Sequence, residues 1–97
     1  MSAPIDGFGR PDVRVQLETD DGVFILLSYT GLVELTETFK KAAASNTETQ
    51  WNDQYMRMVM VFETGAQHYA WLNQFIFIAE GRILNKNEIE YKIYRVT

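Results

Sequence analysis

Three segments of this chain are apolar on both faces of the strand that each would form. They are Val23 to Thr30, in its first half, Met56 to Phe62 and Phe75 to Ala79. A strand with two apolar faces must be covered on both sides. Three such strands in a small antiparallel protein predict a sheet that curls on itself, with a helix or a partner subunit outside it.

Two further segments alternate between apolar and polar residues, which is typical of strands with one exposed face. They are Asp12 to Glu18 and Glu88 to Val96. Asp20-Asp21-Gly22 follows the first of them, and its glycine supplies the positive φ of a tight hairpin turn. We therefore expect the strands on either side of this turn to pair antiparallel.

One helix is expected between the second and third strands. Apolar residues recur at helical spacing from Leu32 to Ala44, and the alanines at its end have high helix propensity. Ser45 to Asp53 is polar and reads as a loop. After the third strand, Thr64 and Gln67 have the spacing of a capping box, which predicts a short helical turn before a strand resumes near Asn73.

The composition indicates one globular domain over residues 1–97, with residues 1–11 as a flexible N-terminal segment. The formal net charge of −4 argues against a nucleic-acid partner. There is no cysteine, no apolar run of membrane-spanning length and no pattern of a signal peptide. We therefore expect a cytoplasmic protein without membrane association.

Several short motifs occur in a fixed order along most of the chain. They are Asp12-Val13-Arg14, Thr19-Asp20-Asp21-Gly22, Tyr29-Thr30-Gly31, Phe62-Glu63-Thr64, Tyr69-Ala70-Trp71-Leu72-Asn73, Gly81 and Tyr94-Arg95-Val96. This pattern resembles the domain of unknown function 3237 family. The resemblance implies a small antiparallel β-barrel similar to the calycin-type barrels, without an established activity.

The resemblance also suggests an incomplete barrel. Members of the family are longer at the N-terminus, where further strands precede the one that corresponds to Asp12 to Glu18. We therefore expect a mainly β protein, either a curled antiparallel sheet or a partial calycin-like barrel, with about five strands and one helix. A barrel that lacks strands has open edges, which invite pairing with another chain. We expect a homo-oligomer, most simply a dimer.

Arg57 and Glu63 are the candidate residues on the third strand. Arg57 lies between methionines on a face shared with Val59 and Val61, so its guanidinium must be solvated or paired. It could bind the carboxylate or phenolate of a ligand, or form an internal salt bridge. Glu63 could act as a general acid or base, or cap backbone amides at the turn. The two lie about 20 Å apart along an extended strand and cannot pair.

Four other residues complete a possible ligand site. If the interior is polar, Arg14, Tyr29 and Asn73 would join Arg57 in a donor-rich pocket, with Trp71 as a flat apolar wall. Arg14 could equally belong to a solvated surface. We expect no cofactor and no metal site, because His68 is the only histidine and cysteine is absent.

Three functions remain open at this point. The first is a barrel that binds a small organic molecule through Arg57, Arg14, Tyr29, Trp71 and Asn73. The second is a cofactor-free lyase or isomerase, in which Glu63 is the acid or base and Arg57 stabilises an anion. The third is a structural module that oligomerises. An Arg57 that is bridged to a protein carboxylate would favour the third function.

Overall fold

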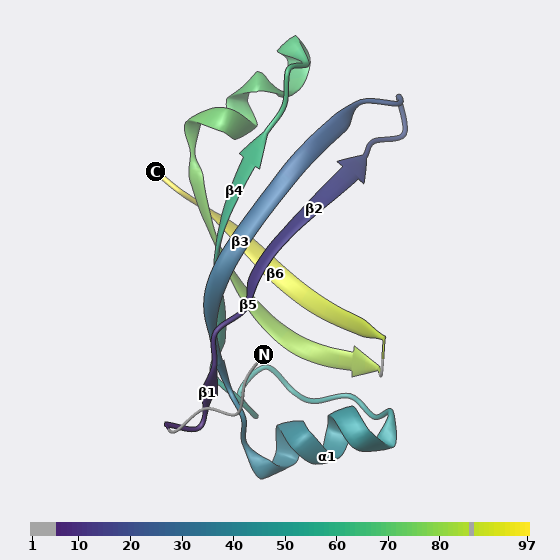
Figure 1. Ribbon diagram of the computed structural model, residues 1–97, viewed down its shortest axis with the longest axis vertical. Helices are drawn as coiled ribbons and strands as arrows, with labels where there is room; N and C mark the ends of the chain where they lie inside the picture. The colour runs from purple at the N-terminus through teal and green to yellow at the C-terminus, as the bar shows by residue number, and fades with distance from the viewer. Residues whose placement is uncertain (1–5, 86) are drawn as a thin grey trace.

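The protein forms one curled antiparallel sheet with two short helices at its ends (Figure 1). The computed structural model describes residues 6–85 and 87–97. The elements are β1 (Phe8–Gly9), β2 (Asp12–Glu18), β3 (Phe24–Glu34), α1 (Glu37–Ser45), β4 (Met56–Glu63), the 3₁₀ helix η1 (Gln67–Gln74), β5 (Ile76–Asn85) and β6 (Glu88–Val96). The mainly β, antiparallel fold that the sequence predicts is confirmed.

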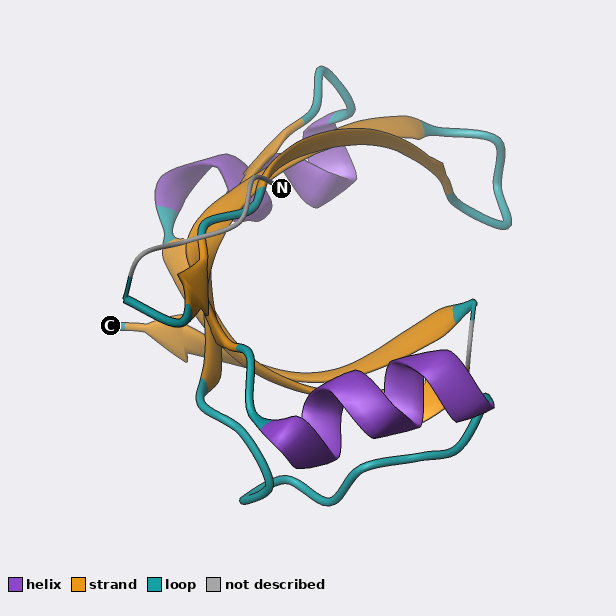
Figure 2. Cartoon of the chain, turned by 60° about the horizontal axis from the view of Figure 1, so that its bottom comes forward, coloured by secondary structure: helices purple, strands orange, loops and turns teal. Residues whose placement is uncertain are grey.

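The sheet is an open trough rather than a closed barrel. Strands follow the order β3, β4, β5 and β6, and both β1 and β2 pair with the free side of β3. Figure 2 shows the gap between the β2–β3 hairpin and the β5–β6 hairpin. Of the segment expected to be flexible, residues 1–5 lie outside the described part of the chain. Phe8–Gly9 form β1, which pairs with Val33 and Glu34.

The first hairpin forms at the predicted turn. Gly22 has a φ of +79°, and its amide donates to the carbonyl of Thr19 at 2.9 Å. The ladder then runs without interruption from Glu18 opposite Phe24 to Asp12 opposite Thr30. This register places the side chains of Val13, Val15 and Leu17 on the inner face of the trough.

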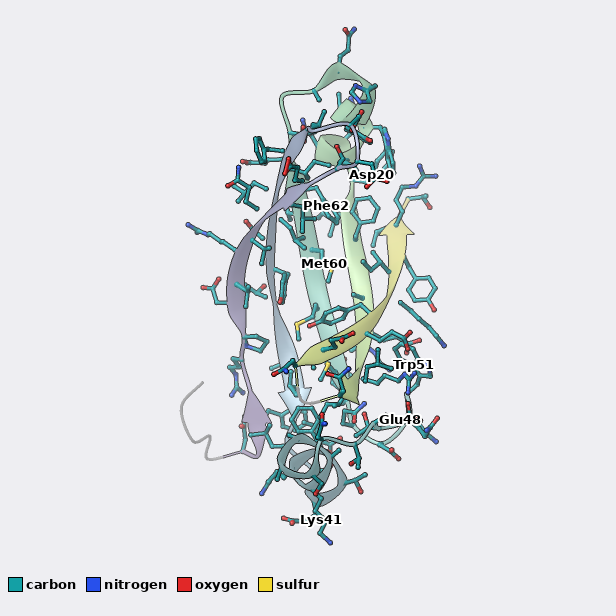
Figure 3. The ribbon with its side chains drawn as sticks, turned by 90° about the vertical axis from the view of Figure 1, so that its right-hand side faces the viewer. Asp20, Lys41, Glu48, Trp51, Met60 and Phe62 are labelled. Atoms are coloured by element: carbon teal, nitrogen blue, oxygen red, sulfur yellow. The ribbon has the colours of Figure 1, made fainter. Side chains whose placement is uncertain are left out.

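The core lines the inner face of the trough. Its buried members are Leu27, Val33, Met56, Met58, Met60, Phe77 and Ala79. Met60 is 1% exposed and lies at mid-length of β4, with Phe62 further toward the upper end (Figure 3). The ring of Phe62 meets that of Phe77 edge-on at 5.1 Å between centroids. The methionine stripe of β4 is therefore part of the core.

The predicted helix begins five residues later than expected. Leu32 belongs to β3, where it lies opposite Arg57, and α1 runs only over Glu37–Ser45. The helical spacing from Leu32 was misleading because Val33 pairs with Met56 in the sheet. Thr36 is the true N-cap, since its Oγ1 accepts a hydrogen bond from the amide of Phe39 at 3.0 Å. α1 closes the lower end of the trough (Figure 1).

The predicted capping box at Thr64 and Gln67 is absent. The N-cap of η1 is Ala66, which has no side-chain hydrogen bond. Thr64 Oγ1 instead accepts from the amide of Ala66 at 3.2 Å and donates to the carbonyl of Phe24 at 3.2 Å. η1 continues through Gln74, so the strand does not resume near Asn73. β5 begins at Ile76 and extends beyond the expected end at Ala79.

Candidate functional site

Arg57 lies on the outer face of β4 and forms an internal salt bridge. Its Nη2 is 3.5 Å from Oε2 of Glu80, the residue directly opposite on β5. Its Nη1 donates to the carbonyl of Met56 at 3.0 Å, and the guanidinium stands 4.9 Å from the centre of the Tyr55 ring. Arg57 is thus bridged to a protein carboxylate, the arrangement that favours a structural role.

Arg14 and Tyr29 point to opposite sides of the sheet. Arg14 lies opposite Ser28 on the outer face and is exposed, whereas Tyr29 lies opposite Met60 on the inner face. The Tyr29 ring packs edge-on against that of Tyr91 at 6.1 Å. Burial, and then the neighbouring Tyr29 hydroxyl, raise the pKa of Tyr91 well above its ordinary value. This tyrosine pair lies in a predominantly apolar interior, remote from Arg14.

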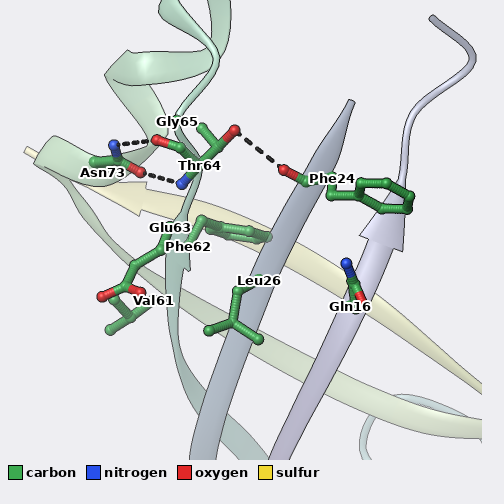
Figure 4. A pocket seen from close by; sticks show the side chains of 9 residues that line it. All are labelled: Gln16, Phe24, Leu26, Val61, Phe62, Glu63, Thr64, Gly65 and Asn73. Atoms are coloured by element: carbon green, nitrogen blue, oxygen red, sulfur yellow. Dashed lines mark hydrogen bonds between the residues drawn. The ribbon is translucent and has the colours of Figure 1, made fainter. Parts of the chain in front are cut away.

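Trp71 and Asn73 belong to η1. Trp71 meets the ring of Phe77 edge-on at 6.2 Å and covers the upper end of the core. Asn73 holds η1 against the end of β4 through both atoms of its amide. Its Oδ1 accepts from the amide of Thr64 at 2.8 Å, and its Nδ2 donates to the Thr64 carbonyl at 2.9 Å (Figure 4). The five predicted ligand-binding residues therefore do not share one pocket, and their binding roles stay predictions.

A different pocket lies at the upper end of the outer face. This upper groove has a volume of about 750 Å³ and is open to solvent. It forms where the β2–β3 hairpin meets the junction of β4 and η1, which the Thr64 to Phe24 hydrogen bond holds together. Its lining is Gln16, Phe24, Leu26, Val61, Phe62, Glu63, Thr64, Gly65 and Asn73 (Figure 4).

The upper groove combines apolar walls with the carboxylate of Glu63. Phe24, Leu26 and Val61 are exposed apolar side chains. Within residues 6–85 and 87–97, the side chains of Gln16 and Glu63 make no hydrogen bond or ion pair. Glu63 lies opposite Leu26 in the ladder, and Gln16 lies opposite Leu26 on its other side. A ligand here would find an apolar surface, an amide and a negative charge.

A polar cluster links the hairpin turn to η1 beside the groove. His68 Nε2 lies 2.9 Å from Oδ2 of Asp21, and the Tyr69 hydroxyl donates to Oδ1 of Asp21 at 3.3 Å. The hydroxyl of Thr19 also donates to Asp21. These hydrogen bonds, first that of Thr19 and then that of His68, lower the pKa of Asp21. The cluster therefore links the two elements that border the groove.

A second, smaller hollow lies lower on the outer face. Its volume is about 320 Å³, and it is lined by Gly31, Leu32, Tyr55, Arg57, Met58, Val59 and Ile78. In the described part of the chain, no group of three or more histidine or acidic residues is placed to hold a metal ion. Nor do the described residues include a helix with the length and hydropathy to cross a bilayer.

Comparison with known proteins identifies the family. A model of the family described as "Protein of unknown function (DUF3237)" matches residues 1–96. The chain belongs to the DUF3237 family. A UPF0311 protein of Clostridium acetobutylicum is 26% identical over 92 residues, which cover 95% of this chain and 58% of that protein.

Solved structures of similar proteins share the fold of this chain. A β-barrel-like protein from Acinetobacter baumannii matches with a TM-score of 0.72 and 30% identity, over 95% of this chain and 58% of its own. A protein of unknown function from Rhodopseudomonas palustris has the same fold with a TM-score of 0.81 and 19% identity, over 97% and 62%. This DUF3237 chain thus spans less than two thirds of the length of these relatives.

Sequence reasoning found two residues of the upper groove, Glu63 and Asn73, and missed most of its walls. The predicted hairpin could have placed Gln16 opposite Leu26, because a tight turn fixes the register of the two strands. The contact between Leu26 and Glu63 depends on the pairing of β3 with β4, which are joined through α1 and a long loop. No local signal in the DUF3237 sequence specifies that register.

Proposed function

We propose that this chain binds a small amphipathic organic molecule in the upper groove. The apolar part of the ligand lies against Phe24, Leu26 and Val61, and a cationic or hydrogen-bond-donating group is directed to Glu63. The supporting observation is a groove of about 750 Å³, within the size range of small-molecule sites, that contains a carboxylate without a partner among the described residues. A primary amine on an aromatic or branched aliphatic body matches this chemistry.

Two features make Glu63 a better anchor than Arg57. The guanidinium of Arg57 is already occupied by Glu80 and by a backbone carbonyl, so an anionic ligand would have to compete with an internal salt bridge. Glu63 has no such partner among the described residues. The lyase or isomerase alternative needs both residues at one substrate, yet they are six positions apart on β4. The arrangement therefore gives more support to binding than to catalysis.

The ligand preference can be tested by NMR titration with three aromatic probes of similar size. Phenethylamine carries a positive charge, 2-phenylethanol is neutral and phenylacetate is negative. We expect the amine to bind with millimolar affinity and to shift the backbone signals of Leu26, Val61, Glu63 and Gly65. Phenylacetate should bind most weakly, because Glu63 repels it.

The matched variants are Glu63→Gln and Glu88→Gln. Both remove one negative charge from an exposed strand residue, but Glu88 lies at the start of β6, outside the groove lining. Because Glu63 is exposed, its ion pair with the amine should contribute at most about 1 kcal/mol, so Glu63→Gln should weaken amine binding by up to about fivefold. Equal affinities for the two variants, or shifts mapped to another surface, would contradict the proposal.

The cytoplasmic location stays a prediction.

A further inference from the structure

The outer face of the sheet carries an apolar patch below the upper groove. We call it the convex patch, and its seven members are between 38% and 55% exposed. They are Leu32, Tyr55, Val59, Ile76, Ile78, Tyr94 and Val96. None of them lines the upper groove. A ligand in that groove and a partner on this patch would therefore occupy different surfaces.

The strand register makes five members of this patch continuous. Val59 on β4 lies opposite Ile78 on β5, and Ile78 lies opposite Tyr94 on β6. Ile76 lies opposite Val96 in the next row of the same face. Residues directly opposite each other have Cβ atoms about 5 Å apart, so these side chains form one surface.

Charged residues border these five members on two sides. Below them, Glu80 lies 3.5 Å from Arg57 Nη2 and 3.9 Å from Lys92 Nζ, which makes a row of three charges across β4, β5 and β6. Leu32 lies opposite Arg57 in this row, and Tyr55 lies beyond it. Toward the β2 edge, Asp12 and Arg14 lie on the same outer face. An apolar centre with a charged rim is the usual composition of a protein interface.

The size of the patch fits a dimer of this chain. From their exposed fractions, the seven side chains present about 600 Å² to solvent, whereas one partner in a standard interface buries roughly 800 Å², of which about two thirds or less is apolar. We propose that two copies of this chain associate through their convex patches.

The patch also has the self-complementarity that a two-fold interface requires. Such an interface uses the same surface on both copies, so one patch must contain both a projection and a recess for it. The recess is the hollow of about 320 Å³, lined by Leu32, Tyr55, Arg57, Val59 and Ile78 among others. The projection is Tyr94, which is 55% exposed and lies on β6 directly opposite Ile78 of the recess. Its hydroxyl donates to Oε1 of Glu80 at 3.5 Å, a long hydrogen bond. In the proposed dimer, the Tyr94 hydroxyl leaves Glu80 and the Tyr94 ring of each copy enters the hollow of the other.

Sedimentation velocity over a range of protein concentrations tests this proposal. The 97-residue chain should form a dimer with a micromolar dissociation constant. Tyr94→Ser removes the projection, and Ile78→Lys places a charge in the recess. Since each change occurs twice in a two-fold interface, we expect either variant to raise the dissociation constant on the order of 100-fold.

Ile93→Ser is the matched control. Ile93 adjoins Tyr94 on β6 and is 48% exposed, but it points to the inner face, opposite Ala79. Ile93→Ser should retain the dimer if the convex patch is the interface. Circular dichroism must show a folded sheet for each variant. If Ile78→Lys does not fold, Val59→Thr replaces it with a similarly shaped polar side chain and should also weaken association.

Three outcomes would overturn the proposal. One is a wild-type chain that stays monomeric throughout the micromolar range. Another is a dimer that folded Tyr94→Ser and Val59→Thr leave unchanged. The last is a dimer that Ile93→Ser dissociates and Tyr94→Ser does not, which would place the interface at the open mouth of the trough.

Discussion

Two glycines of the sheet lie where no side chain fits. Replacing each with alanine should distinguish overlap with a neighbouring side chain from overlap with the neighbouring backbone. A Cβ at Gly81 on β5 would overlap Sδ of Met56 and stand 2.9 Å from Cε1 of Tyr91. A Cβ at Gly31 on β3 would overlap the carbonyl oxygen of Arg57 and stand 2.9 Å from Cα of Met58. The obstacle is thus largely side chain at Gly81 and largely backbone at Gly31.

The two obstacles predict different losses of stability. At Gly81, Met56 must find another rotamer in a core where it is only 2% exposed, and overpacking of this kind costs about 1–3 kcal/mol. The lower entropy of the unfolded alanine variant offsets about 0.4–1 kcal/mol of that cost. At Gly31, relief requires β3 and β4 to separate, which breaks ladder hydrogen bonds, so Gly31→Ala should cost roughly 3 kcal/mol or more.

Urea unfolding at one fixed protein concentration measures both effects. Gly81→Ala should lower the free energy of unfolding by about 1–2 kcal/mol without changing the m-value. Met56→Val removes the obstructing sulfur, so the double variant should be more stable than additivity predicts, by about 1 kcal/mol. For Gly31→Ala, shortening Met58 in the same way should restore little, because the Arg57 carbonyl remains.

Equal losses of unfolding free energy for Gly31→Ala and Gly81→Ala would contradict this explanation. Additive effects of Gly81→Ala and Met56→Val would also contradict it, since the sulfur would then not be the obstacle. Neither glycine has a positive φ, so backbone strain cannot account for a loss of stability at either position.

Further predictions concern titration and the η1 contact. Burial raises the pKa of Tyr91, so the folded state holds the hydroxyl proton more tightly than the unfolded state does. The free energy of unfolding should therefore fall as the pH rises above about 10. In urea titrations, Tyr91→Phe should flatten that fall. The pKa of Asp21 is lowered in the folded state, so its carboxylate stabilises the fold at neutral pH. That stabilisation should be lost as the pH falls through the folded-state pKa, which lies below 3.8. Amide exchange at Tyr69 should then become faster, whereas Asp21→Asn should show no such pH dependence. Asn73→Ala removes both hydrogen bonds to Thr64 and should lower the free energy of unfolding by about 1 kcal/mol. Amide exchange should become faster in η1 but not in α1. Unchanged protection in η1 would contradict the role of Asn73 in holding this helix.

The strands were predictable because they depend on local alternation. Asp12 to Glu18 and Glu88 to Val96 match β2 and β6 residue for residue, since one face of each strand is polar. The boundary between β3 and α1 was harder to predict from the sequence. Leu32 fits a helical repeat with Leu35 and Phe39, and only the long-range pairing of Val33 with Met56 assigns this segment to the sheet. Tertiary pairing here overrides a local pattern.

The candidate site was less predictable because it depends on which face of each strand points inward. The periodicity places Arg57 and Glu63 on one face of β4, which the structure bears out. It does not say that this face is the outside, or that Glu80 on β5 lies opposite Arg57. The sequence alone therefore allowed Tyr29, Arg14 and Arg57 to be placed in one polar pocket, which the structure does not form.

The strands with two apolar faces leave apolar residues on the outside of the sheet as well as in the core. The inner apolar residues of β3, β4 and β5 are buried by the curl of the sheet, together with α1 and η1. The outer apolar residues, among them Val59, Ile78 and Tyr94, have no comparable cover among the described residues. Together the seven residues of the convex patch expose about 600 Å², at the upper end of what one apolar patch of a monomeric protein usually exposes. The apolar outer residues of the same strands therefore support the proposed association of two copies.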